Sequence, residues 1–170
     1  IIAASPTVYD MAAYPKTLSG KTVTAYVNTH TDLSDELYRE GKLVSDNYKN
    51  ILRSQTNAAA IPAEVTVRYG VTVRRANLRN LPTGEGLFFY ASDRNFDALQ
   101  ETALDPGEAV AILHTSTNGY FYYVQAYNYR GWLSKFDVAE TDRSTWLRYA
   151  EPKNFLTVVA KDYTLKADGA

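Results

Sequence analysis

The stretch that decides the fold is residues 113–133, LHTSTNGYFYYVQAYNYRGWL. Two apolar runs flank Asn118-Gly119, a dipeptide that readily adopts the positive φ angles of a tight hairpin turn. A second turn follows at residues 128–131. The stretch therefore predicts a three-stranded antiparallel meander. A meander of this size is not stable alone, so other parts of the chain must close or cover it.

Further strands are predicted on both sides of the meander. Valines at 65, 67, 71 and 73 alternate with polar residues, which is the pattern of a hairpin with one buried face. Strands are expected near residues 65–75, 109–115, 120–127 and 131–134, together with one short closing element. A long irregular loop, residues 87–107, separates the first of them from the second. We expect a mainly β fold, a small SH3-like barrel, because closure removes exposed strand edges.

The N-terminal part is predicted to be an extended and helical extension of this barrel. Breaking residues indicate a loop up to about Gly20, and β-branched residues indicate a strand or extended arm at 21–27. Ser34 and Ser45 each precede acidic residues, which predicts two N-capped helices, the first ending at Gly41.

Domain boundaries are predicted from changes in composition. Residues 56–62 form a small-residue linker, and Thr141 or Asp142 could cap a last helix that ends before Pro152. Residues 155–160 read as a strand that either returns to an earlier sheet or begins a second SH3-like domain. The expected division is an extension at 1–63, a barrel at 64–150, and a tail or start of a second domain at 151–170. A short helical turn is also expected near residues 96–100.

Composition is that of an ordinary globular protein. The 170 residues are 45% hydrophobic and 22% charged with a formal net charge of −1, so long-range attraction to nucleic acid or to an anionic membrane has no support. Tyrosine is abundant, with 14 copies, and suits half-buried strands and surfaces that touch polar ligands. Because the net charge is close to zero, we expect no nucleic-acid partner.

The absence of certain residues excludes several kinds of chemistry. The sequence contains no cysteine, which excludes a thiol nucleophile, a disulfide or a thiolate zinc site within this polypeptide. No run approaches the roughly 18 apolar residues that a membrane span needs, so none is expected. The chain opens with Ile1, not methionine, which we read as processing after export or as trimming of the sequence.

Several short motifs together resemble a known family. They are YGVTVRRANLRNLPT at 69–83, FDALQ at 96–100, DPGE at 105–108, LHTS at 113–116 and GWL at 131–133. This set resembles the first bacterial SH3-type domain of NlpC-type cell-wall cysteine peptidases and covers about residues 65–139. The helical region before it is similar to the N-terminal extension of the same proteins, and residues 155–165 resemble the opening of their second SH3-type domain.

The resemblance implies an accessory role. Complete members carry a Cys-His peptidase domain, similar to γ-D-glutamyl-L-diamino acid endopeptidases that act on murein peptides, after two SH3-type domains. A cysteine peptidase without a thiolate has no nucleophile, so that activity is not carried over to this chain by itself. In such enzymes the first SH3-type domain packs beside the active site and restricts which murein peptide can enter.

Candidate ligand-binding residues are aromatic side chains and two arginines. They are Phe88, Phe89, Tyr90, Phe121, Tyr123, Tyr127, Tyr129, Arg75 and Arg79. The strand aromatics should share one face of the sheet, and either that face or the opposite one must be core. The basic cluster formed by Arg68, Arg74, Arg75 and Arg79 has two interpretations: a solvated face balanced by acids, or contact with a carboxylate.

Other candidate sites are weaker. His114 is predicted to be a hydrogen-bonded structural histidine and His30 a turn residue. No Gly-x-Ser-x-Gly elbow supports a serine triad, so no catalytic residue is assigned. Asp93 begins a segment that mimics a calcium loop, but Ala98 stands where the loop needs glycine. Loop capping by aspartate is the alternative, and we expect neither a metal nor a cofactor.

Three functional hypotheses remain at this point. The first is a noncatalytic murein-peptide recognition or substrate-restricting module of a peptidoglycan hydrolase, secreted to the cell envelope, whether periplasmic or extracellular. Its partner would be a peptidoglycan stem peptide or a neighbouring catalytic domain. The second is the N-terminal part of an endopeptidase whose catalytic domain lies beyond this chain. The third is a purely structural scaffold.

Overall fold

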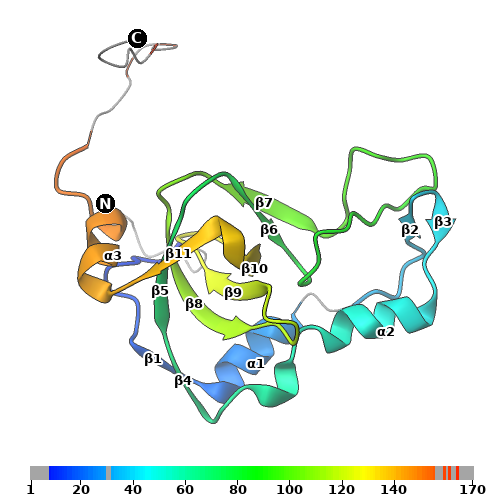
Figure 1. Ribbon diagram of the computed structural model, residues 1–170, viewed down its shortest axis with the longest axis horizontal. Helices are drawn as coiled ribbons and strands as arrows, with labels where there is room; N and C mark the ends of the chain where they lie inside the picture. Colours follow the sequence, from blue (N-terminus) through cyan, green and yellow to red (C-terminus); the bar gives the residue numbers. More distant parts are fainter. Residues whose placement is uncertain (1–7, 30–31, 156–158, 160, 162–163, 165–170) are drawn as a thin grey trace.

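The computed structural model describes residues 8–29, 32–155, 159, 161 and 164 of the chain (Figure 1). The helices are α1 Gly20–Asn28, α2 Asp46–Ser54 and α3 Arg143–Ala150, with 3-10 turns η1 Ala58–Ala60 and η2 Lys135–Asp137. The strands are β1 Thr17–Ser19, β2 Tyr38–Arg39, β3 Lys42–Leu43, β4 Glu64–Thr66, β5 Arg68–Thr72, β6 Ala76–Arg79, β7 Gln100–Leu104, β8 Ala109–Thr115, β9 Phe121–Gln125, β10 Arg130–Ser134 and β11 Val138–Thr141.

Seven strands form the main sheet, in the order β11-β5-β8-β9-β10-β6-β7. The predicted meander is confirmed as β8-β9-β10, in which β9 and β10 pair from Gln125 opposite Arg130 to Phe121 opposite Ser134. Gly119 has φ of 72° in the turn between β8 and β9, where the Asn-Gly signal places it. Asn118 does not have a positive φ, so the connection is a longer turn, with the Ser116 N–H donating to the Phe121 carbonyl at 3.0 Å, and not a two-residue hairpin with two positive φ angles. The mainly β, SH3-like class is confirmed. The expected closure is not, because β11 and β7 remain the two edges of the sheet.

Both faces of the meander are buried. Ala111 and Leu113 point into one core, whereas Val110 and Ile112 point into another. The first core is covered by α1 and α3, which lie against the sheet in Figure 1, and the Trp146 indole of α3 donates to the Val110 carbonyl at 3.1 Å. Tyr123, Val124 and Gln125 of β9 are buried, whereas Phe121 and Tyr122 are partly exposed.

The N-terminal extension shares its cores with the sheet. The core under α1 and α3 joins Val23 and Val27 to Trp132 of β10. A separate core joins side chains of residues 33–52 to those of the loop between β6 and β7: Leu33, Leu37, Val44, Leu52, Leu81, Leu87 and Leu99. The division at residue 63 stays a prediction about sequence organisation, and the packing crosses it in both places.

Two predictions about the extension are wrong. Residues 21–27 form the helix α1 and not a strand, because Ser19 caps the helix and the buried Val23 and Val27 lie four residues apart on one helical face. The helix expected after Ser34 is instead the β2–β3 hairpin, whose turn places Glu40 at φ 52° and Gly41 at φ 80°. In both cases tertiary packing and pairing outweigh local propensity.

The hairpin expected within residues 65–75 is also wrong. β4 pairs with β1, while β5 pairs with β8 and β11, because each half finds a distant partner. β6 and β7 are absent from the sequence-based expectation. In place of the helical turn expected at 96–100 there is a single hydrogen-bonded turn, in which the Gln100 N–H donates to the Asp97 carbonyl at 3.1 Å at the start of β7.

Two other predicted capping signals are confirmed. Ser45 begins α2 and Asp142 begins α3, and each side chain accepts a backbone N–H of its helix. Most of the strand expected at 155–160 lies outside the described residues.

Candidate functional site

The loop between β6 and β7, residues 80–99, carries three exposed aromatic side chains. Phe89, Tyr90 and Phe96 are 50%, 71% and 78% exposed. The loop extends away from the sheet toward the β2–β3 hairpin (Figure 1). We call Phe89, Tyr90 and Phe96 the loop aromatics. Exposed rings of this size gathered on one loop are typical of a contact surface.

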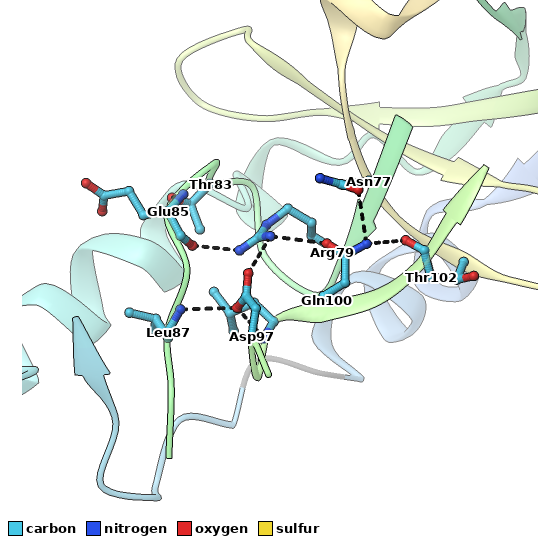
Figure 2. Close-up of polar contacts among 9 residues, drawn as sticks. Asn77, Arg79, Thr83, Glu85, Leu87, Asp97, Gln100 and Thr102 are labelled. Atoms are coloured by element: carbon cyan, nitrogen blue, oxygen red, sulfur yellow. Dashed lines mark hydrogen bonds and ion pairs between the residues drawn. The ribbon is translucent and has the colours of Figure 1, made fainter. Parts of the chain in front are cut away.

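A buried ion pair anchors the loop at its base (Figure 2). The Arg79 side chain is 7% exposed, and its Nη1 lies 2.7 Å from Oδ2 of Asp97, while its Nη2 donates to the Glu85 carbonyl at 2.6 Å. The other carboxylate oxygen of Asp97 accepts the backbone N–H groups of Leu87 and Leu99 at 3.1 and 3.0 Å. The Arg79–Asp97 pair therefore links the part of the loop that follows β6 to the part that precedes β7.

The N-terminal extension holds the loop from the other side. Tyr38 of β2 and Phe88 exchange two backbone hydrogen bonds of 2.7 and 2.9 Å. The core formed by Leu33, Leu87 and their neighbours lies under the same segment. The loop is long, but backbone pairing and the packing of its leucines hold it in place.

A charged cluster borders the loop where it meets the extension. Arg39 of β2 donates to both carboxylate oxygens of Glu85 at 3.1 and 2.9 Å, and the Tyr48 hydroxyl of α2 donates to the same carboxylate. Burial and the adjacent carboxylate raise the pKa of Tyr48. Arg39 and Glu85, together with Phe88 and Arg94, line a hollow of about 210 Å³. Because Arg39 and Glu85 neutralise each other, this pair adds polar groups to the hollow without adding net charge.

Comparison with known proteins finds a family match that includes most of the loop. Residues 87–134 match the family model of the SH3 domain of SH3b1 type. This segment is similar to SH3 domains of the SH3b1 type, and we refer to it as the SH3b1-type domain. It begins inside the loop, at Leu87, and ends with β10, so it contains the loop aromatics and the whole β8-β9-β10 meander.

A solved structure has the same fold. It is described as "a novel NlpC/P60 Endopeptidase from Photobacterium damselae subsp. piscicida", with a TM-score of 0.59 and 21% sequence identity over 74% of this chain. The chain spans 29% of the length of that endopeptidase. No curated protein matches the sequence at a significant level. Among the described residues, no helix is both long and apolar enough to cross a membrane.

The SH3b1-type domain does not bring the predicted site residues to one surface. Tyr123 is 3% exposed in the core and its hydroxyl donates to the Tyr26 carbonyl at 2.7 Å, and Phe121 packs against the same core. Tyr127 and Tyr129 are 49% and 40% exposed, at the turn between β9 and β10. Tyr123 is a core residue, because its face of β9 packs against the extension.

The remaining predicted site residues are also split between buried and exposed positions. Phe88 is half-buried, and the adjacent Phe89 and Tyr90 are exposed on the loop. Arg79 is buried in the anchoring ion pair and does not reach solvent as a ligand contact. Arg75 is exposed, and its Nη1 lies 2.6 Å from Oδ1 of Asp105.

The basic cluster is balanced by acids, as one of its two interpretations expected. Besides the pairs of Arg75 and Arg79, Arg68 lies 2.9 Å from Glu140 and Arg74 lies 3.4 Å from Asp137. None of these four arginines presents an unpaired guanidinium to a ligand.

The weaker candidates have structural explanations. The His114 ring nitrogen Nε2 lies 3.0 Å from the Asn57 carbonyl, and burial lowers the pKa of His114. Asp93 accepts backbone N–H groups of the following loop residues at 2.8 and 3.3 Å, which lowers its pKa and fits the loop-capping alternative. Within the described residues no group of three or more His, Asp or Glu side chains could hold a metal ion. His30 lies outside the described residues.

Sequence reasoning missed two kinds of residue at these surfaces. Glu85 and Asp97 fix the loop, and Arg130 stacks on tyrosines from the extension. Their oppositely charged or tyrosine partners are 18 to 121 positions away in the sequence, and no local pattern indicates such pairs. The only local hint is that Glu85 and Asp97 are acidic residues near the two ends of the loop.

Proposed function

We propose that this chain is a noncatalytic module of an exported peptidoglycan hydrolase, and that the loop aromatics contact murein peptide and restrict which peptide reaches the catalytic domain. The observation that carries the proposal is the loop of the SH3b1-type domain, held by the buried Arg79–Asp97 pair with three aromatic rings exposed. The structural similarity to an NlpC/P60 endopeptidase supports the hydrolase context.

The physical argument rests on preorganisation. A surface whose rings are already ordered loses little conformational entropy when it binds, so more of the contact energy appears as affinity. The loop is ordered by the ion pair, by the Tyr38–Phe88 pairing and by the core beneath it. Aromatic faces suit peptide backbones and aliphatic stems, and the adjacent polar hollow suits amide and carboxylate groups.

A second candidate is that the chain is the front portion of an NlpC-type endopeptidase. It is favoured by one observation, that the chain spans 29% of the similar endopeptidase. The sequence has no cysteine, so the thiolate of such an enzyme would have to lie outside the 170 residues. The loop aromatics would then contact the peptidase domain itself, or the substrate at the entrance to its active site.

The test is a binding assay with purified murein. The chain is sedimented with intact sacculi and titrated with soluble stem peptides, and the variant Phe89→Ala/Tyr90→Ala/Phe96→Ala is compared with a matched pair of exposed rings elsewhere, Tyr120→Ala/Phe136→Ala. These control rings are 53% and 62% exposed. We expect the loop variant to lose at least fivefold in binding and the control to keep it.

Two results would contradict the proposal. Equal binding by the loop variant and the control would remove the loop aromatics from recognition. Absence of murein binding by the unaltered chain, together with unchanged activity of a hydrolase carrying the loop substitutions, would leave the scaffold hypothesis.

A further inference from the structure

Arg130, at the start of β10, differs from the paired arginines of the sheet. Arg68, Arg74, Arg75 and Arg79 each have a carboxylate within 4.0 Å. In the described part of the chain Arg130 has none, although its guanidinium is held in a fixed position. A fixed, unneutralised guanidinium is a binding group for an anion.

The orientation of Arg130 is set by three contacts. Its guanidinium carbon lies 3.4 Å from the centroid of the Tyr26 ring, its Nε donates to Oε1 of Gln125 at 2.6 Å, and its Nη2 donates to the Tyr9 hydroxyl at 2.8 Å. Gln125 is itself 1% exposed, and its amide donates to the carbonyls of Ala126 and Tyr129. Arg130 is therefore held by side chains whose own positions are fixed by packing and hydrogen bonds.

Two hydrogen-bond donors, one on Arg130 and one on Tyr9, remain available to a ligand. Nη1 of Arg130 has no hydrogen-bond partner among the described residues, and it is not among the buried unpartnered atoms, so it reaches solvent. The Tyr9 hydroxyl accepts from Arg130 and keeps its own proton to donate. The two groups are hydrogen-bonded to each other, so both can reach one small anion.

The surroundings do not cancel the positive charge. Tyr14 and Tyr123 stay neutral beside Arg130, because burial raises the pKa of each hydroxyl. Glu101 influences Tyr123 through its charge, but among the described residues no carboxylate lies within 4.0 Å of the Arg130 side-chain nitrogens. The cluster thus carries one positive charge with aromatic walls.

We propose that Arg130 and Tyr9 form a binding site for a peptide carboxylate. The planar guanidinium edge matches a carboxylate, and the exposed rings of Tyr127 and Tyr129 lie next to Arg130 in the sequence, at the tip of the same hairpin, where they can cover the adjoining peptide backbone. Tyr9 and Tyr26 come from the N-terminal extension, so the extension completes the site. This site is separate from the loop aromatics and does not depend on the function proposed for them.

The experiment is an NMR titration of the full 170-residue chain with two probes that differ in one group. The probes are the blocked peptides acetyl-Ala-Glu-Ala-amide and acetyl-Ala-Gln-Ala-amide. We expect the Glu peptide to shift the Arg130 Nε–H and the backbone N–H signals of Gln125 and Tyr129 with a dissociation constant in the millimolar range. The Gln peptide should bind at least fivefold more weakly.

Variants separate this site from nonspecific attraction. Arg130→Gln should abolish the shifts of Gln125 and Tyr129, and Tyr9→Phe, which keeps the ring, should weaken binding about threefold. Arg75→Gln removes an exposed, ion-paired arginine and should leave the affinity unchanged. The folded state of each variant is checked from the dispersion of its amide spectrum.

The proposal is overturned if the Glu peptide causes no shift at these positions up to about 20 mM, or if the two peptides bind equally. Tighter binding of inorganic phosphate than of the Glu peptide would also overturn it, because the site would then be a general anion site. If Arg130→Gln does not fold, Tyr9→Phe and the Arg130 Nε–H signal of the unaltered chain decide the question.

Discussion

The Arg79–Asp97 pair offers the sharpest test of how the loop is held. Asp97→Asn keeps the size of the side chain and removes its charge, leaving the Arg79 guanidinium buried without a counter-ion. The amide also has one oxygen where the carboxylate has two. The substituted side chain can therefore accept either from Arg79 or from the N–H groups of Leu87 and Leu99, but not from both sides at full strength.

The magnitude follows from burial. Removing one partner of a buried pair costs about 3–5 kcal/mol of unfolding free energy, because the remaining charge is left uncompensated. The side chains of Arg79 and Asp97 are 7% and 19% exposed, so water screens the aspartate partly and the lower end of the range applies. We expect a loss of about 3 kcal/mol, which for a chain of this length lowers Tm by roughly 6–12 °C.

The assay is urea unfolding followed by tryptophan fluorescence, with Asp105→Asn as the matched control. Asp105 pairs with Arg75 at the similarly short distance of 2.6 Å, but the two side chains are 70% and 68% exposed. An exposed pair contributes little, so the control should change the free energy of unfolding by less than about 0.5 kcal/mol. A loss below about 1 kcal/mol for Asp97→Asn, or equal losses for both variants, would refute the argument that burial of this pair fixes the loop.

Three further predictions concern the sheet and its supports. Gly131→Ala should destabilise the fold by about 1–3 kcal/mol, because its Cβ would lie 2.7 Å from the Arg79 carbonyl oxygen, whereas Gly84→Ala, with open space around it, should be neutral; thermal unfolding of both variants compares them. Ser45→Ala should cost about 1 kcal/mol in the same measurement, because the hydroxyl caps α2. Burial lowers the pKa of His114 from 6.5, so the unfolded chain binds a proton there more readily than the folded one. Stability should therefore fall as the pH drops below 6.5, and urea unfolding of His114→Gln at pH 5 and 7.5 should show a smaller loss than the unaltered chain.

Local signals predicted the parts of the fold that depend on local interactions. The Asn118-Gly119 turn, the Ser45 cap and the Asp142 cap each act within four residues, and each is found where the sequence places it. The β-branched segment 21–27 misled because the pattern of buried valines fits a helix face as well as a strand. The helix is favoured by the Ser19 cap just before the segment and by the packing of Val23 and Val27 in one core with Trp132. No pattern within residues 21–27 contains that information.

The candidate site was harder to predict because burial decides it. Tyr123 and Tyr127 lie on the same strand or its extension and have the same side-chain chemistry, but they are 3% and 49% exposed. The sequence indicates that one face of β9 must be core. It does not indicate that the extension supplies a second core on the opposite face, which turns Tyr123 from a surface candidate into a structural residue.

Both proposed surfaces are built from residues on each side of position 63. The extension gives Tyr38 to the loop, and it gives Tyr9 and Tyr26 to Arg130. The family match at 87–134 contains the exposed rings and the arginine but none of these three supporting tyrosines. The matched segment therefore carries the exposed rings and Arg130, while the extension supplies Tyr9 to the proposed carboxylate site and orients Arg130 and the loop. A related chain that keeps the segment but changes the extension would be expected to lose the orientation of Arg130 first, because that guanidinium takes two of its three fixing contacts from the extension.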